Sequence, residues 1–341
     1  MTDNPAIQYS HNSLKKIENS RYTASLRLSV APMLDWTDTH CRSFHRILAP
    51  DARLYTEMVH ANAVLKGDRD RLLGFDPAER PLALQLGGSV PATLAAASRI
   101  GEEWGYDEIN LNVGCPSDRV QAGRFGACLM KEPTLVADCI AAMMAVTRSS
   151  KITVKCRLGV DEDRDFGKFL AFIDTVAATG CDSFVVHARA AWLQGLSPKE
   201  NRDIPPLRYD WVHQLKNERP GLRIVINGGI GDIDAVLEQL RHCDGVMLGR
   251  AAYHDPYLLH ELNAALYGSP LQDRAELLAS FRPHVEARLG EGTALKHMTR
   301  HILGLYHGKP GGRRFRQILS EGAHHPEAGW NLVEQAVIAT E

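Results

Sequence analysis

The sequence predicts an α/β fold, a (β/α)8 TIM barrel followed by a small C-terminal helical domain. Short β-branched or apolar runs alternate with longer helix-compatible segments, as in parallel βα units. Eight such runs can be counted along the chain. Its 341 residues exceed the size at which single hydrophobic cores stop growing, so a second, smaller domain is expected.

The predicted strands are short, and polar or glycine-rich residues follow each of them. They span residues 28–31, 53–56, 82–86, 108–112, 152–155, 183–187, 223–227 and 245–248. Helix-compatible segments such as residues 91–103 and 232–240 come between them. A doubly wound sheet would also alternate, but it usually has fewer strands and a glycine fingerprint in its first βα turn. The first turn here reads Pro32-Met33-Leu34-Asp35, so the barrel is favoured.

The domain boundaries follow from composition and pattern. Residues 1–24 are polar, without the apolar core of a signal peptide, and are expected to form a flexible leader. The barrel is expected over residues 25–264 and the helical domain over residues 265–341. The longest apolar runs, such as residues 139–146, are shorter than the roughly 20 residues that cross a bilayer, so no membrane insertion is expected.

The cysteines and the net charge restrict the class of protein. The 7 cysteines include no Cys-x-x-Cys pair, which argues against a disulfide framework and a zinc site and favours a reducing cytoplasm. The formal net charge of -2 predicts no overall attraction to polyanions, although a local basic surface remains possible.

In a barrel of this kind the chemistry lies just past the carboxyl ends of the strands. Asn227, Gly228 and Gly229 follow the seventh predicted strand, and Gly249 and Arg250 follow the eighth. Such glycine turns can bring backbone N–H groups to a phosphate, and an arginine adds a charge-assisted contact. Asn-Gly-Gly alone is usually an ordinary turn, but two such turns in these places favour a phosphate site for some phosphorylated ligand.

Three further polar residues lie at strand ends. Lys155 ends an apolar strand, which suits an anionic or electron-accepting partner such as a reduced flavin; a surface lysine and a Schiff-base lysine are the alternatives. Gln85 would face the same mouth as a flavin contact or as a core-edge amide. His187 suits phosphate or ring binding, or a structural hydrogen bond.

The segment from residue 292 to 320 is basic, with no Asp or Glu. Its positive residues are Lys296, Arg300, Lys309, Arg313, Arg314 and Arg316. Leu295, Met298, Ile302 and Leu305 repeat at helical spacing, which predicts an amphipathic helix stopped by Gly308 and Pro310. The segment is either a solvated face or a surface for a polyanion. His297 and His301 have helical metal-ligand spacing, but the sequence shows no third ligand, so no metal is expected.

The strand-end motifs together resemble the tRNA-dihydrouridine synthase family over about residues 25–320. They are Ala31-Pro32-Met33 with Asp35, Glu57-Met58, Gln85-Leu86-Gly87-Gly88, Asn110-Leu111-Asn112-Val113-Gly114-Cys115-Pro116, Val154-Lys155-Cys156-Arg157, His187-Ala188-Arg189, Asn227-Gly228-Gly229 and Leu248-Gly249-Arg250. The stretches 196–202 and 299–301 resemble the A-type bacterial subfamily.

The resemblance implies an enzyme that reduces uridine in tRNA, at D-loop positions 20 and 20a for the A-type subfamily. It implies NADPH as reductant, Cys115 as catalytic acid and Asn112 as a residue that holds the target base. The implied FMN-binding residues are Pro32, Met33, Gln85, Lys155, His187, Asn227, Gly228, Gly229, Gly249 and Arg250.

Chemical need supports Cys115 as the acid. Reduction of the uracil double bond requires a hydride at carbon 6 and a proton at carbon 5. A thiol of ordinary pKa, about 8.5, is still protonated near neutral pH. An isolated cysteine is more often a small buried hydrophobe, but Asn112-x-x-Cys115 at a strand end favours catalysis; Cys128 and Cys156 are expected to be structural.

A stacked uracil must be pulled out of folded tRNA while the rest of the RNA lies on basic protein surface. The residues expected to contact the RNA are Arg189, Lys199, Arg202, Lys296, Arg300, Arg313 and Arg316. Two alternatives remain open. One is an FMN barrel enzyme for a small molecule, similar to dihydroorotate dehydrogenase, and the other is a non-catalytic RNA-binding module on the same scaffold.

Overall fold

The computed structural model describes residues 20–161 and 165–340. Residues 1–19 of the expected leader lie outside this range. Residues 20–24 are helical, and the Tyr22 hydroxyl donates a hydrogen bond of 2.8 Å to Glu108 on a barrel strand. The last residues before the barrel are therefore attached to it.

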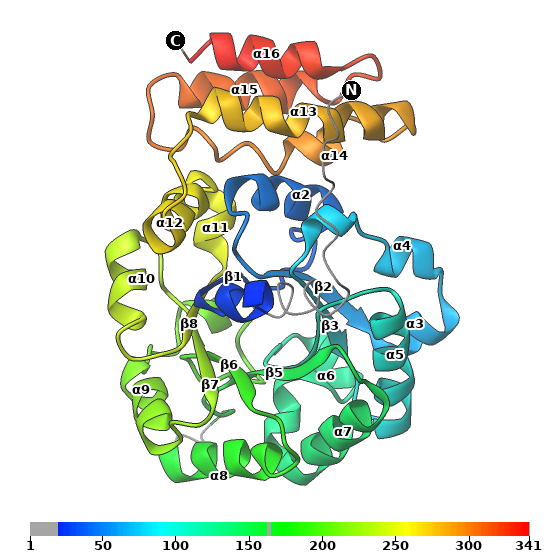
Figure 1. Cartoon of the computed structure of the whole chain (residues 1–341), viewed down its shortest axis with the longest axis vertical. Helices are drawn as coiled ribbons and strands as arrows, with labels where there is room; N and C mark the ends of the chain where they lie inside the picture. The colour runs from blue at the N-terminus through cyan, green and yellow to red at the C-terminus, as the bar shows by residue number, and fades with distance from the viewer. Residues whose placement is uncertain (1–19, 162–164, 341) are drawn as a thin grey trace, which may run out of the picture.

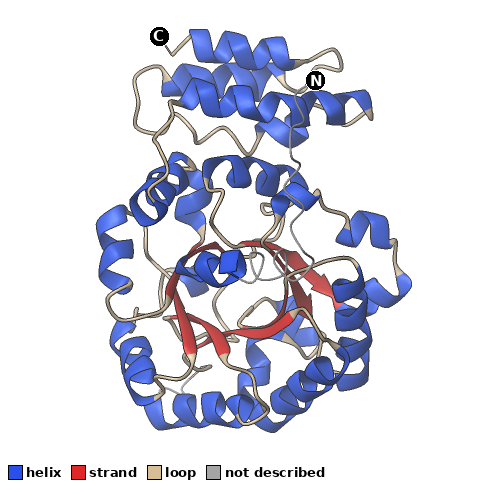
Figure 2. Ribbon diagram, in the orientation of Figure 1, coloured by secondary structure: helices blue, strands red, loops and turns tan. Residues whose placement is uncertain are grey.

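Eight parallel strands form the barrel, which confirms the predicted fold class (Figures 1 and 2). They are β1 (Leu28–Val30), β2 (Leu54–His60), β3 (Leu82–Gly87), β4 (Glu108–Val113), β5 (Lys151–Arg157), β6 (Ser183–His187), β7 (Arg223–Asn227) and β8 (Gly245–Leu248). Their order is β1-β8-β7-β6-β5-β4-β3-β2. A single parallel bridge between Ser29 and Arg53 joins the two ends of this order and closes the ring.

Helices surround the strands (Figure 2). The α-helices of the barrel are α2 (Thr39–Leu48), α3 (Ala61–Lys66), α4 (Arg69–Leu73), α5 (Pro91–Glu103), α6 (Asp118–Ala122), α7 (Pro133–Val146), α8 (Phe166–Ala177), α9 (Tyr209–Glu218), α10 (Ile233–Gln239), α11 (Arg250–His254) and α12 (Tyr257–Tyr267). Short 3-10 helices are η1 (Ser25–Arg27), η2 (Pro77–Glu79), η3 (Gly126–Lys131) and η4 (Glu200–Arg202). None of the described helices is long and apolar enough to cross a membrane.

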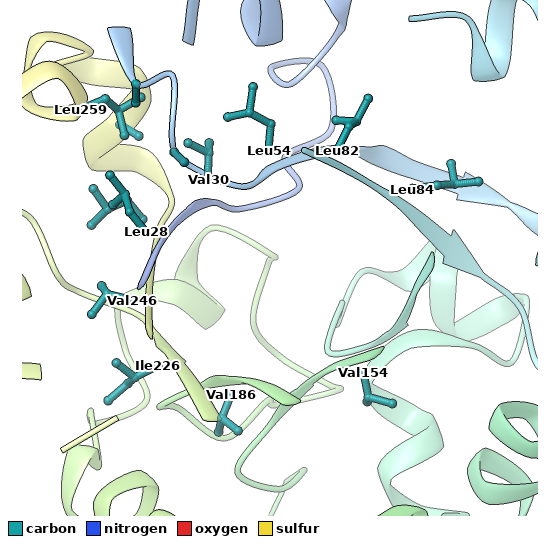
Figure 3. Close-up of a cluster of buried hydrophobic side chains, with 14 of the residues drawn as sticks. Leu28, Val30, Leu54, Leu82, Leu84, Val154, Val186, Ile226, Val246 and Leu259 are labelled. Carbon is teal, nitrogen blue, oxygen red and sulfur yellow. The ribbon is translucent and has the colours of Figure 1, made fainter. Parts of the chain in front are cut away.

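The strands alternate between two packing layers. Leu28, Val154 and Val186 point away from the barrel axis, and the main hydrophobic core fills this outer layer between strands and helices (Figure 3). The residues between them, such as Val185 and Met247, point inward and belong to a smaller inner cluster. Because the side chains alternate, strands buried on both faces carry both kinds of core.

The C-terminal helices are α13 (Arg274–Gly290), α14 (Lys296–Thr299), α15 (Gly312–Gly322) and α16 (Trp330–Ile338). They stack on one side of the barrel, against α2 (Figure 1). Phe44 of α2 meets Phe281 of α13 with ring centroids 5.1 Å apart. The expected boundary between residues 264 and 265 falls inside α12, which continues to Tyr267 and ends at the left-handed Gly268.

The expected amphipathic helix from Leu295 to Leu305 is wrong in length. Leu295, Met298, Ile302 and Leu305 are all buried, but α14 covers only four residues and turns follow it. A side chain at Gly304 would lie 2.3 Å from the His254 carbonyl oxygen, so the segment approaches the barrel backbone closely. Spacings of three and four residues suit a series of tight turns as well as an α-helix, so the pattern could not separate the two.

Candidate active site

The site lies where the predicted strand-end residues converge at the carboxyl ends of β3, β4, β5 and β7. Asn112 of β4 donates a hydrogen bond of 2.8 Å to the Gln85 side chain of β3. Across the mouth, the Lys155 ammonium of β5 donates to the Asn227 side chain of β7 at 3.1 Å. The structure therefore brings four of the predicted site residues into two directly bonded pairs.

Cys115 sits on the loop after β4, and the Asn112 side chain holds this loop. The Asn112 carbonyl oxygen accepts hydrogen bonds from the backbone N–H groups of Cys115 at 2.9 Å and of Gly114 at 3.1 Å. The Ala127 N–H donates to the Cys115 carbonyl at 2.9 Å. Gly126 has a φ of +75°, and a side chain there would lie 2.5 Å from that carbonyl, so only glycine fits beside the loop.

Cys115 and Cys128 are partly exposed, and the other five cysteines are buried. Cys156 is fully buried, and burial raises the pKa of its thiol to about 12. Burial and then Glu132 raise the pKa of Cys128, whose sulfur donates to the Phe125 carbonyl at 3.1 Å. High pKa values and these surroundings suit structural roles for both.

Lys155 lies near the end of β5, and its surroundings make its ammonium easier to deprotonate. Desolvation, followed by the positive charge of Arg157, lowers the pKa of Lys155 to about 8. Asn227 supplies a neutral acceptor but no charge. An anion placed beside this ammonium would raise its pKa again, so the position suits an anionic ligand.

His187 ends β6 beside the Asn227-Gly228-Gly229 turn. Burial, followed by the nearby charges of Arg157 and Lys155, lowers the pKa of His187 well below its ordinary value. The imidazole is therefore neutral and carries one N–H donor. Gly228 has a φ of +114°, and a side chain there would lie 2.5 Å from the imidazole.

The residues around this turn fit a phosphate. Gly229 also has a positive φ, of +71°, so two successive glycines turn the backbone after β7. The Arg189 Nε atom is buried and, among the described residues, has no hydrogen-bond partner. The charge of Arg250 lies near Arg189, and Arg250 is paired with Asp203 at 2.5 Å. An unsatisfied buried donor near a second arginine and a glycine turn is what an anionic group would satisfy.

Gly249, Pro32 and Met33 complete the predicted set. A side chain at Gly249 would lie 4.0 Å from the Met33 sulfur, which places the turns after β8 and β1 side by side. The Met33 N–H donates to the Thr37 hydroxyl at 3.0 Å, and the Thr37 N–H donates back to the Met33 carbonyl at 2.9 Å. This fixed turn continues directly from Pro32.

Arg157 is a residue whose role sequence reasoning missed. Its side chain is buried, and it donates to the carbonyls of Gly114 at 2.9 Å, Ala190 at 3.1 Å and Asn201 at 2.9 Å. It therefore ties the Cys115 loop to the loop after β6. The signal was an arginine at the buried end of a strand, where a charge needs several partners.

The residues expected to contact RNA fall into three groups. Arg189, the first, is half-buried at the mouth near Arg250 and Asp203, where its side chain also suits the phosphate described above. Lys199, Arg202, Lys296, Arg313 and Arg316 are exposed. Arg300 is exposed as well, but it pairs with Asp38 at 2.5 Å, and the same carboxylate meets the buried His301 at 3.0 Å. Although burial opposes ionisation, hydrogen bonds from His301, Cys41 and Arg300 hold the pKa of Asp38 well below its usual range. Arg300 therefore connects the C-terminal segment to the barrel, and its contact with RNA stays a prediction.

His297 and His301 do not form part of a metal centre in the described chain. His301 bonds to Asp38 and Tyr253, whereas His297 is exposed. Among residues 20–161 and 165–340, no group of three or more His, Cys, Asp or Glu side chains could hold a metal ion.

The fold and the site together define a parallel (β/α)8 barrel enzyme with polar side chains at its mouth. Residues 29–340 match the family model described as dihydrouridine synthase (Dus). The chain belongs to the dihydrouridine synthase family.

The curated relatives cover nearly the whole chain, and each is called a tRNA-dihydrouridine(20/20a) synthase. The protein from Xanthomonas campestris pv. campestris is 70% identical over 92% of this chain and 94% of its own length. The Pseudomonas aeruginosa protein is 54% identical over 94% of this chain and 96% of its own length. The Vibrio cholerae protein is 52% identical over 92% and 97%.

Solved structures resemble this chain in fold. Morphinone reductase superposes with a TM-score of 0.50 at 12% identity, over 74% of this chain and 89% of its own. A complex of 2-naphthoyl-CoA reductase with 2-naphthoyl-CoA gives a TM-score of 0.54 at 10% identity, over 72% of this chain and 50% of its own. At these identities the likeness shows the barrel alone.

Proposed function

We propose that this chain reduces uridine to 5,6-dihydrouridine in tRNA, with FMN as the bound cofactor and NADPH as the reductant. The observation that carries the proposal is the cluster at the barrel mouth: the partly exposed Cys115 on a held loop, together with Lys155 and the Asn227-Gly228-Gly229 turn. Relatives up to 70% identical are named tRNA-dihydrouridine(20/20a) synthases. These names support tRNA as the substrate and positions 20 and 20a, in the D-loop, as the target.

The residues fit the proposed cofactor by their donor chemistry. Gly228, Gly229, Arg189 and Arg250 would hold the phosphate, with the neutral His187 beside them. Lys155 and Gln85 would contact the ring, where the lysine charge suits the electron-rich pyrimidine side. When bound, FMN supplies the hydride for carbon 6 of the uracil.

Cys115 supplies the other half of the reaction. Its thiol would give a proton to carbon 5, while Asn112 holds the loop that presents it. We further infer that the enzyme works in the cytoplasm, where its tRNA substrate occurs and where its seven free thiols stay reduced. The exposed Lys199, Arg202, Lys296, Arg313 and Arg316 would carry the RNA backbone.

A spectrum and an assay test the proposal together. The purified protein should show flavin absorbance with about one FMN per chain, and it should convert uridine to dihydrouridine in unmodified tRNA only when NADPH is added. Colourless protein that takes up no added FMN would contradict the flavin site. Flavin without tRNA reduction, but with turnover of dihydroorotate, would favour the small-molecule alternative. Binding of tRNA without flavin would favour the RNA-binding module.

A further inference from the structure

A line of buried hydrogen bonds runs from the Cys115 loop into the barrel interior. The Cys115 N–H donates to the Asn112 carbonyl oxygen at 2.9 Å, and the Asn112 amide nitrogen donates to the Gln85 oxygen at 2.8 Å. The Gln85 nitrogen donates in turn to the Asn110 oxygen at 2.8 Å. Each amide side chain receives a hydrogen bond on its oxygen and passes one on from its nitrogen.

The line continues to the opposite end of the barrel. The Asn110 nitrogen donates to the Thr153 hydroxyl at 2.8 Å, and that hydroxyl donates to the Glu108 carboxylate at 2.5 Å. The other donors to the Glu108 carboxylate are Arg53, Tyr55 and Tyr22. Burial and then Glu108 raise the pKa of Tyr55 well above its usual value, so its phenol stays a donor.

The two ends of this line fix its direction. A carboxylate can only accept, so the Thr153 hydrogen points to Glu108, and Asn110 must turn its nitrogen to Thr153. The orientation of Asn110 then fixes that of Gln85, and Gln85 fixes that of Asn112, whose side-chain oxygen faces the loop. Backbone N–H groups can only donate, and they require that same oxygen independently. Both ends therefore demand one orientation for all three amides, and the orientations agree.

Polar side chains inside the barrel need an explanation beyond packing. Inward positions of such barrels are usually filled by branched apolar residues, and each buried amide costs free energy unless its hydrogen bonds are made. Valine has nearly the shape of Thr153, so packing alone does not require the hydroxyl. Thr153 is 1% exposed and Glu108 is 0% exposed, and neither reaches the mouth.

We propose that Glu108 and Thr153 are remote positioning residues, which orient the Gln85 and Asn112 amides through this line of hydrogen bonds and so hold the Cys115 loop. The role rests on the proposed function, because it concerns delivery of a proton from Cys115. The orientation leaves the second N–H of Gln85 and one lone pair of its oxygen for a ligand at the mouth.

The test replaces Thr153 by valine and by serine in the flavin-loaded protein. Thr153→Val removes the hydroxyl, so the Asn110 amide nitrogen loses its acceptor. The Asn110 amide can then flip, and the orientations of Gln85 and Asn112 are no longer fixed from this end. We expect turnover at saturating tRNA to fall roughly ten- to hundredfold, as for other small misplacements of a reacting group, with little change in KM. Thr153→Ser keeps the hydroxyl and should restore most of the turnover.

A second readout does not depend on the reaction. The rate at which iodoacetamide alkylates Cys115, followed by mass spectrometry, should rise several-fold in Thr153→Val, because the loop is held less firmly. The same rate in Thr153→Ser should match that of the parent protein. If the parent protein fails to reduce tRNA, the proposed function fails, but the alkylation rates still decide whether Thr153 holds the loop.

Val154→Ala is the matched control. Val154 is the next residue on β5, is fully buried and points outward to the helices (Figure 3). This variant should lower the melting temperature yet keep turnover and alkylation near those of the parent. Parental turnover and alkylation in Thr153→Val would overturn the proposal, as would a loss of turnover in Val154→Ala as large as in Thr153→Val. Should Thr153→Val fail to fold, Thr153→Ala takes its place in both measurements with the same expected outcomes.

Discussion

The barrel mouth and the C-terminal basic surface are built in opposite ways. At the mouth, Asn112, Gln85 and Arg157 are buried, and their polar atoms bond to neighbouring residues. On α15, Arg313 and Arg316 are exposed, and neither forms an ion pair with a described residue. One region holds buried, bonded donors and acceptors, and the other holds charges exposed to water.

The difference separates two kinds of work. Chemistry on one base needs groups held to within about an ångström, which only a packed interior provides. Attraction of a polyanion needs charge at the surface, and such contacts are sensitive to salt rather than to geometry. We therefore expect changes at the Cys115 loop to alter the rate of tRNA reduction and changes on α15 to alter the affinity for tRNA.

The largest effect should come from Cys115→Ala. Loss of the proton donor should slow tRNA reduction by roughly two to four orders of magnitude, the usual range for general acid catalysis. NADPH should still reduce the flavin, since that step does not use the thiol. Stopped-flow absorbance measures the two half-reactions separately.

Cys128→Ala is the control for this variant, because Cys128 lies on η3, where its sulfur bonds to the Phe125 carbonyl and not to the Cys115 loop. It should leave both half-reactions near those of the parent. If a Cys115→Ala protein reduces tRNA at the parental rate, the thiol is not the proton donor. The expectation that changes at the mouth alter the rate would then lose its main support.

The fold was predictable because its pattern is local and repeated. The strands β6, β7 and β8 have the bounds that the apolar runs predict. Strand β2 continues to His60, four residues past the predicted end. Residues 57–60 mix polar and apolar side chains, so the apolar run stops before the strand does. Pairing of Met58, Val59 and His60 with β3 extends it.

The site was predictable where residues carry strand-end motifs and not where tertiary contacts decide. Gln85, Asn112, Lys155 and Asn227 meet as expected because parallel strands end at one face. The pairing of Arg300 with Asp38 could not be predicted, because the two residues are 262 positions apart in the chain. Nor does sequence spacing show that the side chains of Thr153 on β5 and Asn110 on the neighbouring β4 are bonded to each other.

The second prediction concerns pH and the charge at the mouth. Since burial lowers the pKa of Lys155 to about 8, the apoprotein loses this charge above that pH, and binding of the FMN anion must take up a proton. FMN affinity should be nearly constant from pH 7 to 8 and then fall by up to about tenfold per pH unit. Flavin fluorescence titrations from pH 7 to 9.5 measure it.

The sign follows from linkage. The pKa of Lys155 in the folded apoprotein lies below that of the unfolded chain, so the unfolded chain binds more protons between about pH 8 and 10. Its contribution to the stability of the apoprotein therefore rises with pH in this window. Lys155→Met should bind FMN more weakly and without this pH dependence. A flat affinity profile in the parent protein would show that Lys155 is not charged by the ligand.

The smallest effect should come from the basic surface. If Arg313 and Arg316 contact phosphates, Arg313→Ala with Arg316→Ala should reduce the slope of log affinity against log salt by roughly 0.7 to 0.9 for each residue. Flavin content and NADPH oxidation with a non-RNA acceptor should be unchanged, because α15 lies outside the barrel (Figure 1). Filter binding to tRNA at several salt concentrations gives the slope.

Arg300→Ala is the matched comparison on the same segment. Its guanidinium is already paired with Asp38, so its loss should leave the salt slope within one contact of the parent. A partly exposed pair contributes less than about 1 kcal/mol, so the melting temperature should fall by only a few degrees. If the double variant on α15 binds tRNA with the parental slope while Arg300→Ala flattens it, the RNA lies on the junction between barrel and helices, and Arg313 and Arg316 form an ordinary solvated face.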